Sequence, residues 1–362
     1  MQAQKVEIRW QARSFEDADF EKASALRKLF LAEGGSQRRS CEPDYYRWKL
    51  LTNPAGLGLL HVADDGGQVV GITTITPKRV HLRGKPTLGA EIGDTFTHPD
   101  YQRQGMFSTL VGLTREKASL AGLEFIYGTP NDQSRPGYEK KLNFAQVPSS
   151  RVYSYVRPLN LAPVLSVHLG RPIVAKLLAP VIGLAFQTLY RFRSPGRKGV
   201  DISLVSEFPL DITDLFERCA SKYSWILRRD KEYLDWRFLA NPDQYHVWIA
   251  SRGGKTAGYL VTREGHFGGL RGGYLADFLV DEDFPEVFQE LLFSAASSLR
   301  SAGVDFLAAW AVKASFYQRI LSRCGFLQLK PVPIICYKND VGLQFVQGQD
   351  RWHFAMSDSD NI

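Results

Sequence analysis

Residues 91–107, EIGDTFTHPDYQRQGMF, constrain the fold of this chain more than any other stretch. Residues 91–97 are rich in β-branched and apolar side chains, which predicts a short strand. His98, Pro99 and Asp100 end that strand, because proline cannot donate a hydrogen bond to a central ladder. Leucines at positions 110, 113 and 120 then follow with helical spacing. The sequence therefore predicts a strand, a tight basic turn and a helix in direct succession.

This succession favours the binding of an anion. The first amide groups of a helix lack intrahelical partners, and the helix dipole is positive at that end. Gly105 allows the backbone to approach a phosphate closely, and Arg103 adds a fixed positive charge. Glycine with basic neighbours at a helix start is a common pattern, so by itself it does not identify an anion site. The surrounding sequence has to show whether this turn binds one.

Composition narrows the choice of protein class. The chain has 362 residues, of which 44% are hydrophobic and 23% charged, enough for two domains. Four cysteines without a C-x-x-C pair argue against a disulfide framework and against a metal site, and indicate a cytoplasmic location. The polar N-terminus is not a secretory signal. The net charge of +7 would suit nucleic acid, a membrane surface or an anionic cofactor. Nucleic acid is the least favoured, since no zinc-finger or aromatic-basic signature accompanies the charge.

The order of predicted elements is that of a mixed α/β protein. Val6, Ile8 and Trp10 alternate as a first strand, and two helices are expected at 17–31 and 44–51. A hairpin of strands at 59–63 and 69–76 follows, and a further strand is expected at 123–128. The basic turn lies between these last two strands.

The turn and the residues after it resemble the GNAT N-acetyltransferase superfamily, most clearly over residues 60–147. In that family [QR]-x-x-G-x-[GA] holds the pyrophosphate of coenzyme A, and Gln102 and Gly105 match it. Phe107 stands at the last small position, and Asn143 stands where the family's Y-x-x-x-G-F motif has glycine. The resemblance implies that acetyl-CoA or coenzyme A is bound by Phe96, Thr97, Gln102, Arg103, Gln104, Gly105, Met106, Phe107, Asn131 and Ser134.

The resemblance also implies an acid and a base. Glu91 lies eleven residues before Gln102, the offset of the general base in histone-acetylating members. Asp94 is the alternative base, but the two side chains cannot both face one cleft unless a bulge intervenes. Tyr138 falls where the family places the proton donor to the departing thiolate. Structural alternatives remain: a salt-bridged carboxylate for Glu91 or Asp94, a half-buried aromatic for Tyr138, and helix capping for Asn131 and Ser134.

The second half of the chain repeats the first. The motif W-[KR]-[LF]-L-x-N-P occurs at 48–54 and again at 236–242, and packing is its preferred role. The predicted fold class is α+β, with two tandem GNAT-like domains, each a mostly antiparallel sheet flanked by helices. The predicted segments are 1–157, the catalytic domain; 158–199, a linker; 200–340, the second domain; and 341–362, a tail. Opposite the basic turn, the second copy carries Asp281, Glu282 and Asp283, which would repel phosphate.

Two segments leave alternatives open. Residues 158–198 combine apolar runs with basic residues, and either lie on an anionic membrane surface or form packed helices that bridge the domains. The packed arrangement is preferred, because the longest uncharged run is too short to span a bilayer. The C-terminal tail is either an acidic lip near the pocket or frayed, and fraying is preferred.

The predicted function is an acyl-CoA-dependent N-acyltransferase, with acetyl-CoA as the preferred donor. The acyl group would pass directly to the primary amine of a small molecule, such as an amino sugar, an amino acid or an aminoglycoside-like compound. One alternative is a non-catalytic module that binds acyl-CoA. Another is an acyltransferase that works at a membrane surface on a lipid-linked or long-chain substrate.

Overall fold

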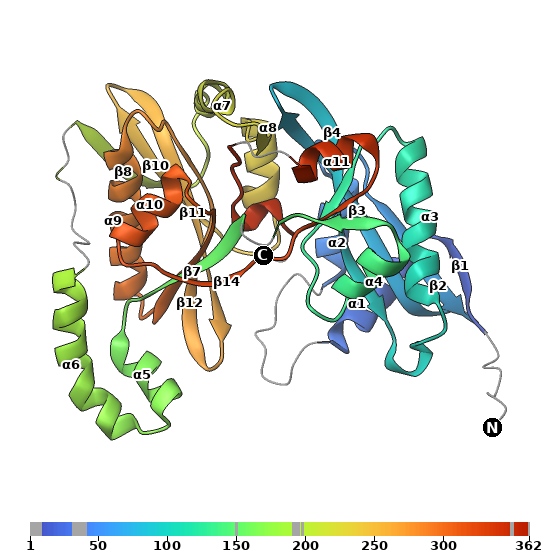
Figure 1. Ribbon diagram of the computed structural model, residues 1–362, viewed down its shortest axis with the longest axis horizontal. Helices are drawn as coiled ribbons and strands as arrows, with labels where there is room; N and C mark the ends of the chain where they lie inside the picture. Colours follow the sequence, from blue (N-terminus) through green and yellow to red (C-terminus); the bar gives the residue numbers. More distant parts are fainter. Residues whose placement is uncertain are drawn as a thin grey trace.

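The computed structural model describes residues 9–30, 42–148, 151–189, 196, 199–347 and 351–360. Two β-sheets lie next to each other, and each is flanked by helices (Figure 1). This arrangement confirms the predicted α+β fold class. Val6 and Ile8 of the predicted first strand lie outside the described residues, and the first strand that the structure describes is Gln11–Ser14.

The first sheet has the strand order β1-β2-β3-β4-β5-β15-β6, with β9 paired to β3. Its strands are β1 (Gln11–Ser14), β2 (Leu59–Asp65), β3 (Gln68–Leu82), β4 (Lys85–Thr97), β5 (Ile126–Gly128), β6 (Phe144–Gln146), β9 (Trp225–Leu227) and β15 (Ile335–Tyr337). The helices of this half are α1 (Asp19–Lys28), α2 (Pro43–Leu51), the 3₁₀ turn η2 (Pro99–Tyr101), α3 (Met106–Leu120) and α4 (Arg135–Lys141). The predicted strand, turn and helix around residues 91–107 are thus β4, η2 and α3.

The second sheet has the order β14-β7-β13-β12-β11-β10-β8. Its strands are β7 (Val152–Pro158), β8 (Val200–Val205), β10 (His246–Arg252), β11 (Lys255–Phe267), β12 (Leu270–Val280), β13 (Phe306–Val312) and β14 (Leu327–Pro331). Around it lie α7 (Ile212–Ala220), α8 (Lys231–Leu234), the π-helical turn η3 (Asp235–Leu239), α9 (Pro285–Ser301) and α10 (Phe316–Arg323). Beyond β15 the chain adds α11 (Asp340–Gln347) and the 3₁₀ turn η4 (Met356–Asp358).

The two sheets exchange strands. β7 follows the first sheet in the chain but lies between β13 and β14 of the second sheet. β15 follows the second sheet but lies between β5 and β6 of the first. The sheets therefore do not coincide with the predicted segments 1–157 and 200–340. β7 and β15 are each paired on both sides, which ties the two halves of the chain together.

The repeated motif packs against its own second copy. The indole rings of Trp48 and Trp236 stack with centroids 4.8 Å apart and planes 16° apart. Trp48 Nε1 donates to the carbonyl oxygen of Trp236 at 2.8 Å, and Trp236 Nε1 donates to that of Trp48 at 3.3 Å. The preferred packing role of the motif is confirmed, because the motif forms a reciprocal contact between the two halves.

The prediction of a frayed C-terminal tail is wrong. Residues 352–359 are buried between the two sheets. Trp225 lies against Trp352 and Phe354, with ring centroids 5.5 and 5.2 Å apart. The backbone N–H of His353 donates to the carbonyl oxygen of Trp225 at 2.9 Å. This aromatic burial outweighs the chain entropy that would otherwise leave a terminus mobile.

For the described part of residues 158–198, the preferred placement as a bridge between the domains is also wrong. Helices α5 (Leu161–Leu169) and α6 (Pro172–Leu189) form a hairpin at the outer edge of the second half, and they do not bridge the two halves (Figure 1). Several of their large apolar side chains are exposed. Within the described part of the chain, no helix is long and apolar enough to cross a membrane.

Candidate active site

The centre of the site is a β-bulge in β4. Thr74 pairs with Gly93 and Ile72 with Phe96, so that one residue of β3 faces two residues of β4, Asp94 and Thr95. Asp94 has a φ of 41°, in the left-handed region that an inserted bulge residue can adopt. The bulge re-aims the side chains that follow it. Glu91 and Asp94 were expected to face one cleft only if a bulge lies between them, and β4 contains such a bulge.

After the bulge, β4 separates from β5. The two parallel strands pair only at Ala90 with Ile126 and at Glu91 with Tyr127, within the described residues. Phe96 and Thr97 remain paired to β3 on their other side. Their backbone groups that face β5 therefore have no strand to pair with, and can bind an extended ligand instead.

A cavity of about 190 Å³ lies beside this open edge. It brings together the three predicted catalytic side chains with Phe96, Asn131 and Ser134. The lining residues are Arg27, Glu91, Ile92, Gly93, Asp94, Thr95, Phe96, Gly128, Thr129, Pro130, Asn131, Ser134, Tyr138, Ile335 and Asp360. Ile335 and Asp360 come from the C-terminal part of the chain, so both halves of the sequence contribute to the site.

The predicted anion site is the turn between η2 and α3. Gln102, Arg103 and Gly105 are exposed, and Gly105 lies directly before α3 with a φ of 83°. Arg103 also has a positive φ, of 64°. A residue with positive φ can turn the amide groups of neighbouring residues toward one concave surface, where an anion can bind them. The space where a Cβ of Gly105 would lie is open. A phosphate can approach the backbone there.

Three side chains of the turn have other partners. Gln104 accepts a hydrogen bond from Trp10 Nε1 at 3.1 Å through its Oε1, which orients the side chain and leaves its Nε2 and its backbone N–H to donate to an anion. Met106 is buried against Gly71 of β3. Phe107, which the family pattern would replace by a small residue, packs edge-on against Tyr138 at 4.9 Å and lies close to Gly137 of α4. Phe107 thus links α3 to α4.

Glu91 is a buried carboxylate, 2% exposed. Both of its oxygens accept the backbone N–H of Asp360 at 3.0 Å, and Lys78 Nζ lies 3.4 Å away. Burial, with the negative charge of Asp360 next, raises the pKa of Glu91 to about 8, although Lys78 and Lys49 oppose the shift. With such a pKa, Glu91 is mostly protonated at pH 7 and about half ionised at pH 8, and its ionised form can accept a proton.

Asp94 is ion-paired, as its structural alternative predicts. Lys49 Nζ lies 2.8 Å and Arg27 Nη1 lies 3.1 Å from its carboxylate oxygens. Burial alone would raise the pKa of Asp94, but Arg27 and Lys49 outweigh burial and hold the pKa below its usual value. A weakly basic, doubly paired carboxylate is poorly suited to accept a proton.

Tyr138 lies within hydrogen-bonding reach of the bulge. Its Oη is 3.0 Å from Thr95 Oγ1, which in turn is 2.8 Å from Thr73 Oγ1. Burial raises the pKa of Tyr138 to about 12, so the phenol is protonated at neutral pH. It can therefore act as a proton donor, as expected from its position in the sequence.

Asn131 caps the start of α4. Its Oδ1 accepts the backbone N–H of Gln133 at 3.1 Å and of Ser134 at 2.8 Å, and Ser134 Oγ lies 3.0 Å from the same oxygen. The capping alternative therefore applies to both residues. They also line the cavity, so capping places them where a ligand can contact them.

Four charged residues of the site were not assigned to it from the sequence: Arg27, Lys49, Lys78 and Asp360. The carboxylate of Asp360 lies 2.9 Å from Lys49 Nζ and 3.0 Å from Lys78 Nζ. Asp360 lines the cavity, as the alternative of an acidic C-terminal lip expected. A signal for Lys49 was the basic position of the repeated W-[KR] motif. Lys49 binds Asp360, and its counterpart Arg237 donates to the carbonyl oxygen of Ser359 at 3.3 Å. Both copies of the motif hold the C-terminal segment.

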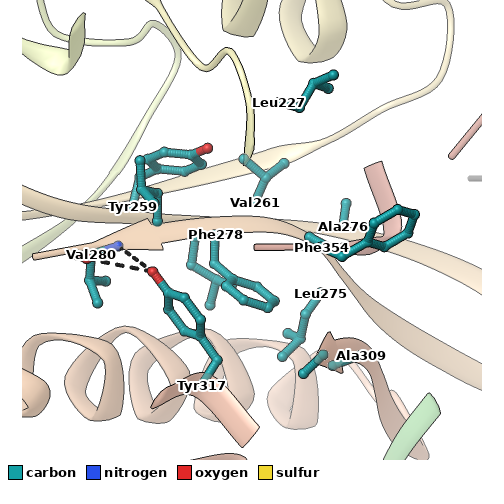
Figure 2. Close-up of a cluster of buried hydrophobic side chains, with 14 of the residues drawn as sticks. Leu227, Tyr259, Val261, Leu275, Ala276, Phe278, Val280, Ala309, Tyr317 and Phe354 are labelled. Carbon is teal, nitrogen blue, oxygen red and sulfur yellow. Dashed lines mark hydrogen bonds between the residues drawn. The ribbon is translucent and has the colours of Figure 1, made fainter. Parts of the chain in front are cut away.

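The second sheet has a matching bulge but no matching groove. Val261 pairs with Asp277 and Thr262 with Leu275, which leaves Ala276 as the extra residue of β12. Beyond it, the carbonyl oxygen of Phe278 bonds to His353 Nε2 at 2.8 Å. Tyr317 Oη accepts the backbone N–H of Val280 at 3.0 Å, and Phe354 lies beside Ala276 (Figure 2). The chain's own side chains thus fill the place that corresponds to the open edge of β4.

The turn before α9 also differs from the turn before α3. Lys222 Nζ lies 3.0 Å from the carboxylates of both Asp281 and Asp283. Glu282 is bonded to Tyr223 and Arg351. The carboxylates that were expected to repel phosphate are therefore present at this helix start, held by neighbouring cations.

Comparisons with known proteins agree with this geometry. Residues 11–147 match the family model of an acetyltransferase (GNAT) domain. No curated protein sequence matches the chain. A probable N-acyltransferase from Enterococcus faecalis matches with a TM-score of 0.61 and 13% identity, covering 90% of this chain and 72% of that chain. A GCN5-related N-acetyltransferase from Anabaena variabilis matches with a TM-score of 0.60 and 12% identity, covering 91% and 72%.

A third solved structure is that of Saccharomyces cerevisiae N-myristoyltransferase with bound myristoyl-CoA. It matches with a TM-score of 0.62 and 14% identity, covering 92% of this chain and 83% of that chain. Identities this low establish the fold alone. They extend the likeness to both sheets, in agreement with two tandem GNAT-like domains. Residues 11–147 therefore match the model of a GNAT acetyltransferase domain, and the fold of the whole chain is similar to that of solved N-acyltransferase and N-myristoyltransferase structures.

Proposed function

We propose that the protein is an acyl-CoA-dependent N-acyltransferase, and that its first domain alone binds the acyl donor. The observation that carries the proposal is the separation of β4 from β5 beside the start of α3. The open edge of β4 lines a cavity together with the carboxylate of Glu91 and the phenol of Tyr138, and β4 leads through η2 to the N-terminus of α3. The family match of residues 11–147 supports the same assignment.

The described residues suit coenzyme A. The amide groups of Met106, Phe107 and Ser108 open α3, where no intrahelical acceptor exists, and would bind the pyrophosphate with help from Arg103. The backbone of Phe96 and Thr97 would bind the extended pantetheine arm. When bound, the thioester would supply an acyl group activated for attack by an amine.

Glu91 and Tyr138 would handle the protons. Glu91, with a pKa of about 8, would accept a proton from the acceptor's ammonium group, since a base near that pKa is matched to neutral pH. Tyr138, with a pKa of about 12, would donate a proton to the departing sulfur. Both side chains line the same cavity. Asp94 would orient Lys49 and take no part in proton transfer.

The size of the cavity supports a short acyl group and a small acceptor. About 190 Å³ lies below the roughly 300–1,000 Å³ of most drug-sized ligand pockets. We therefore propose acetyl-CoA as the donor and the primary amine of a small molecule as the acceptor, such as an amino sugar, an amino acid or an aminoglycoside-like compound.

Incubation of the full chain with acyl-CoA and a panel of amines tests this function. We expect a mass increase of one acetyl group on at least one small amine, detected by mass spectrometry, together with free coenzyme A. Gly105→Glu, which places a carboxylate at the anion site, serves as the control that loses the reaction. Tight binding of acetyl-CoA without transfer to any amine would instead support the non-catalytic binding module.

A further inference from the structure

We propose that the α5–α6 hairpin is a docking surface for an anionic lipid bilayer. An exposed apolar face of α6, the charges around it and its place in the molecule all favour this partner. None of these involves the first-domain site. The proposal can therefore be tested separately from acyl transfer.

The outer face of α6 carries a continuous apolar stripe. Ile173, Leu177, Val181 and Leu184 recur at helical spacing and are 76%, 73%, 69% and 69% exposed. Val174, Leu178 and Ile182 extend the same surface with 38%, 42% and 37% exposure, and Val167 and Leu169 of α5 add to it. Single exposed apolar residues are ordinary, but a contiguous apolar surface indicates an interaction site.

The stripe is not the face by which the hairpin packs on the protein. Ala179, Gly183 and Phe186 lie on the inner side of α6, where they line a cavity of about 820 Å³ together with Phe293 and Ala296 of α9. Leu184 of the stripe also reaches this cavity, although its side chain is 69% exposed. The guanidinium of Arg157 lies over the ring of Phe186 at 5.1 Å. Because the inner side of α6 faces the second sheet, the stripe faces solvent.

The charges of this region select the partner. Residues 159–198 contain six Lys and Arg residues and no Asp or Glu. Among them, Arg171 in the turn between the helices and Lys176 on α6 are exposed. Arg157 and Arg300 both line the cavity beneath the hairpin. Within the described residues, α5, α6 and the turn between them thus carry cations and no carboxylate. An apolar face next to positive charge is complementary to an anionic membrane surface, where acyl chains lie beneath negative headgroups.

The helices are suited to lie on a bilayer, not to cross it. α6 contains Lys176 and Pro180, and no described helix is apolar over a spanning length. The hairpin lies at the end of the molecule farthest from β1 and α3 (Figure 1). Docking through it would leave the first-domain cavity open to water-soluble substrates.

Flotation of the full chain with vesicles tests the proposal. We expect capture by vesicles of phosphatidylglycerol mixed with phosphatidylcholine, little capture by phosphatidylcholine alone, and loss of capture at high salt. The double variant Leu177→Gln and Val181→Gln should lower partitioning by about tenfold or more. Lys176→Gln should lower it by about fivefold.

A matched control uses apolar side chains exposed elsewhere. Leu120 and Leu210 are 90% and 87% exposed, and Leu120→Gln with Leu210→Gln should leave vesicle capture unchanged. Unchanged coenzyme A binding would show that each variant is folded. Absence of capture by anionic vesicles, or equal capture of both double variants, would overturn the proposal. So would a dimer in light scattering that Leu177→Gln with Val181→Gln dissociates, since the stripe would then be a contact between copies of the chain.

Discussion

At Glu91, burial and the charge of Asp360 disfavour the ionised form, while Lys78 and Lys49 favour it. The balance leaves a pKa of about 8, close to the pH at which a base must work. Asp94 lies three residues away with its side chain 9% exposed, and its pKa is lowered because Arg27 and Lys49 both contact it. The two carboxylates of one strand thus differ in pKa because the charged groups around them differ.

Replacement of Glu91 should remove a proton-transfer step while the donor site stays intact. Glu91→Gln should lower turnover by roughly 10²- to 10⁴-fold. The deficit should shrink well above pH 8, because the amine then loses its proton without help. Steady-state rates of both proteins across this pH range measure the effect, with Glu116→Gln on the exposed side of α3 as the control. A deficit that persists undiminished at high pH would mean that Glu91 only anchors Asp360.

Tyr138→Phe should lower turnover by a similar or smaller factor, because water can partly replace a proton donor. The affinity for coenzyme A should stay within about twofold, since the substitution leaves the amides of α3 untouched. Calorimetric titration and steady-state kinetics together check both statements. A loss of affinity that matched the loss of turnover would assign Tyr138 to packing with Phe107 instead.

His61 gives the first sheet a pH-dependent stability. It is buried, with Nδ1 2.8 Å from Thr114 Oγ1, and burial with the charge of Lys117 lowers its pKa to about 4. Below its ordinary pKa of 6.5, the unfolded chain binds a proton that the folded chain does not. Stability should therefore fall between pH 6.5 and about 4, by up to about 3 kcal/mol.

Urea unfolding at neutral and acidic pH measures this dependence. His61→Gln should flatten it, whereas replacement of the exposed His168 by glutamine should leave it as in the natural chain. An identical pH dependence in His61→Gln would show that other groups carry it.

Among the elements, β4 was predictable as a strand but its bulge was not. The order of strand, proline turn and helix is written in local sequence, and the structure contains it as β4, η2 and α3. The bulge depends on the register between Thr73 and β4, which no local pattern encodes. It is this register that opens the strand edge and brings Glu91 and Asp94 to one cavity.

The C-terminal segment is the element for which local reasoning failed. Its sequence ends in small and acidic residues, which are typical of a frayed terminus. Its partners are residues far away in the chain, such as Trp225 for Phe354 and Phe278 for His353. Contacts between residues so far apart in the chain leave no periodic pattern in the sequence. These contacts place Asp360 in the first-domain site.

Truncation of one aromatic side chain in this segment should be costly. Phe354 is 2% exposed, so Phe354→Ala should lower the free energy of unfolding by about 3–5 kcal/mol. Phe267 is 73% exposed at the tip of the β11–β12 hairpin, and Phe267→Ala should change the free energy of unfolding by no more than about 0.5 kcal/mol. Chemical denaturation of both variants gives the comparison. Equal stabilities would mean that the segment contributes nothing to the fold.

For the whole molecule, the repeat in the sequence predicted two similar halves but not how they are joined. Stacked Trp48 and Trp236 join the two copies of the repeated motif, and the exchanged strands β7 and β15 tie the sheets together. The exchange of β7 and β15 cannot be inferred from the order of strands along the chain, because the backbone N–H and C=O groups of a strand can form hydrogen bonds in either sheet. The halves differ in the groove, which is open in the first and filled by His353 and Phe354 in the second.

Calorimetric titration of the full chain with acetyl-CoA tests this division of labour most directly. Gly105→Glu and Pro285→Glu each place a carboxylate at the start of a helix that follows a bulged strand, α3 or α9. We expect one molecule of acetyl-CoA per chain, a loss of affinity of at least about tenfold in Gly105→Glu from charge repulsion and lost space, and unchanged affinity in Pro285→Glu. Two binding sites per chain, or equal weakening in the two variants, would contradict the account.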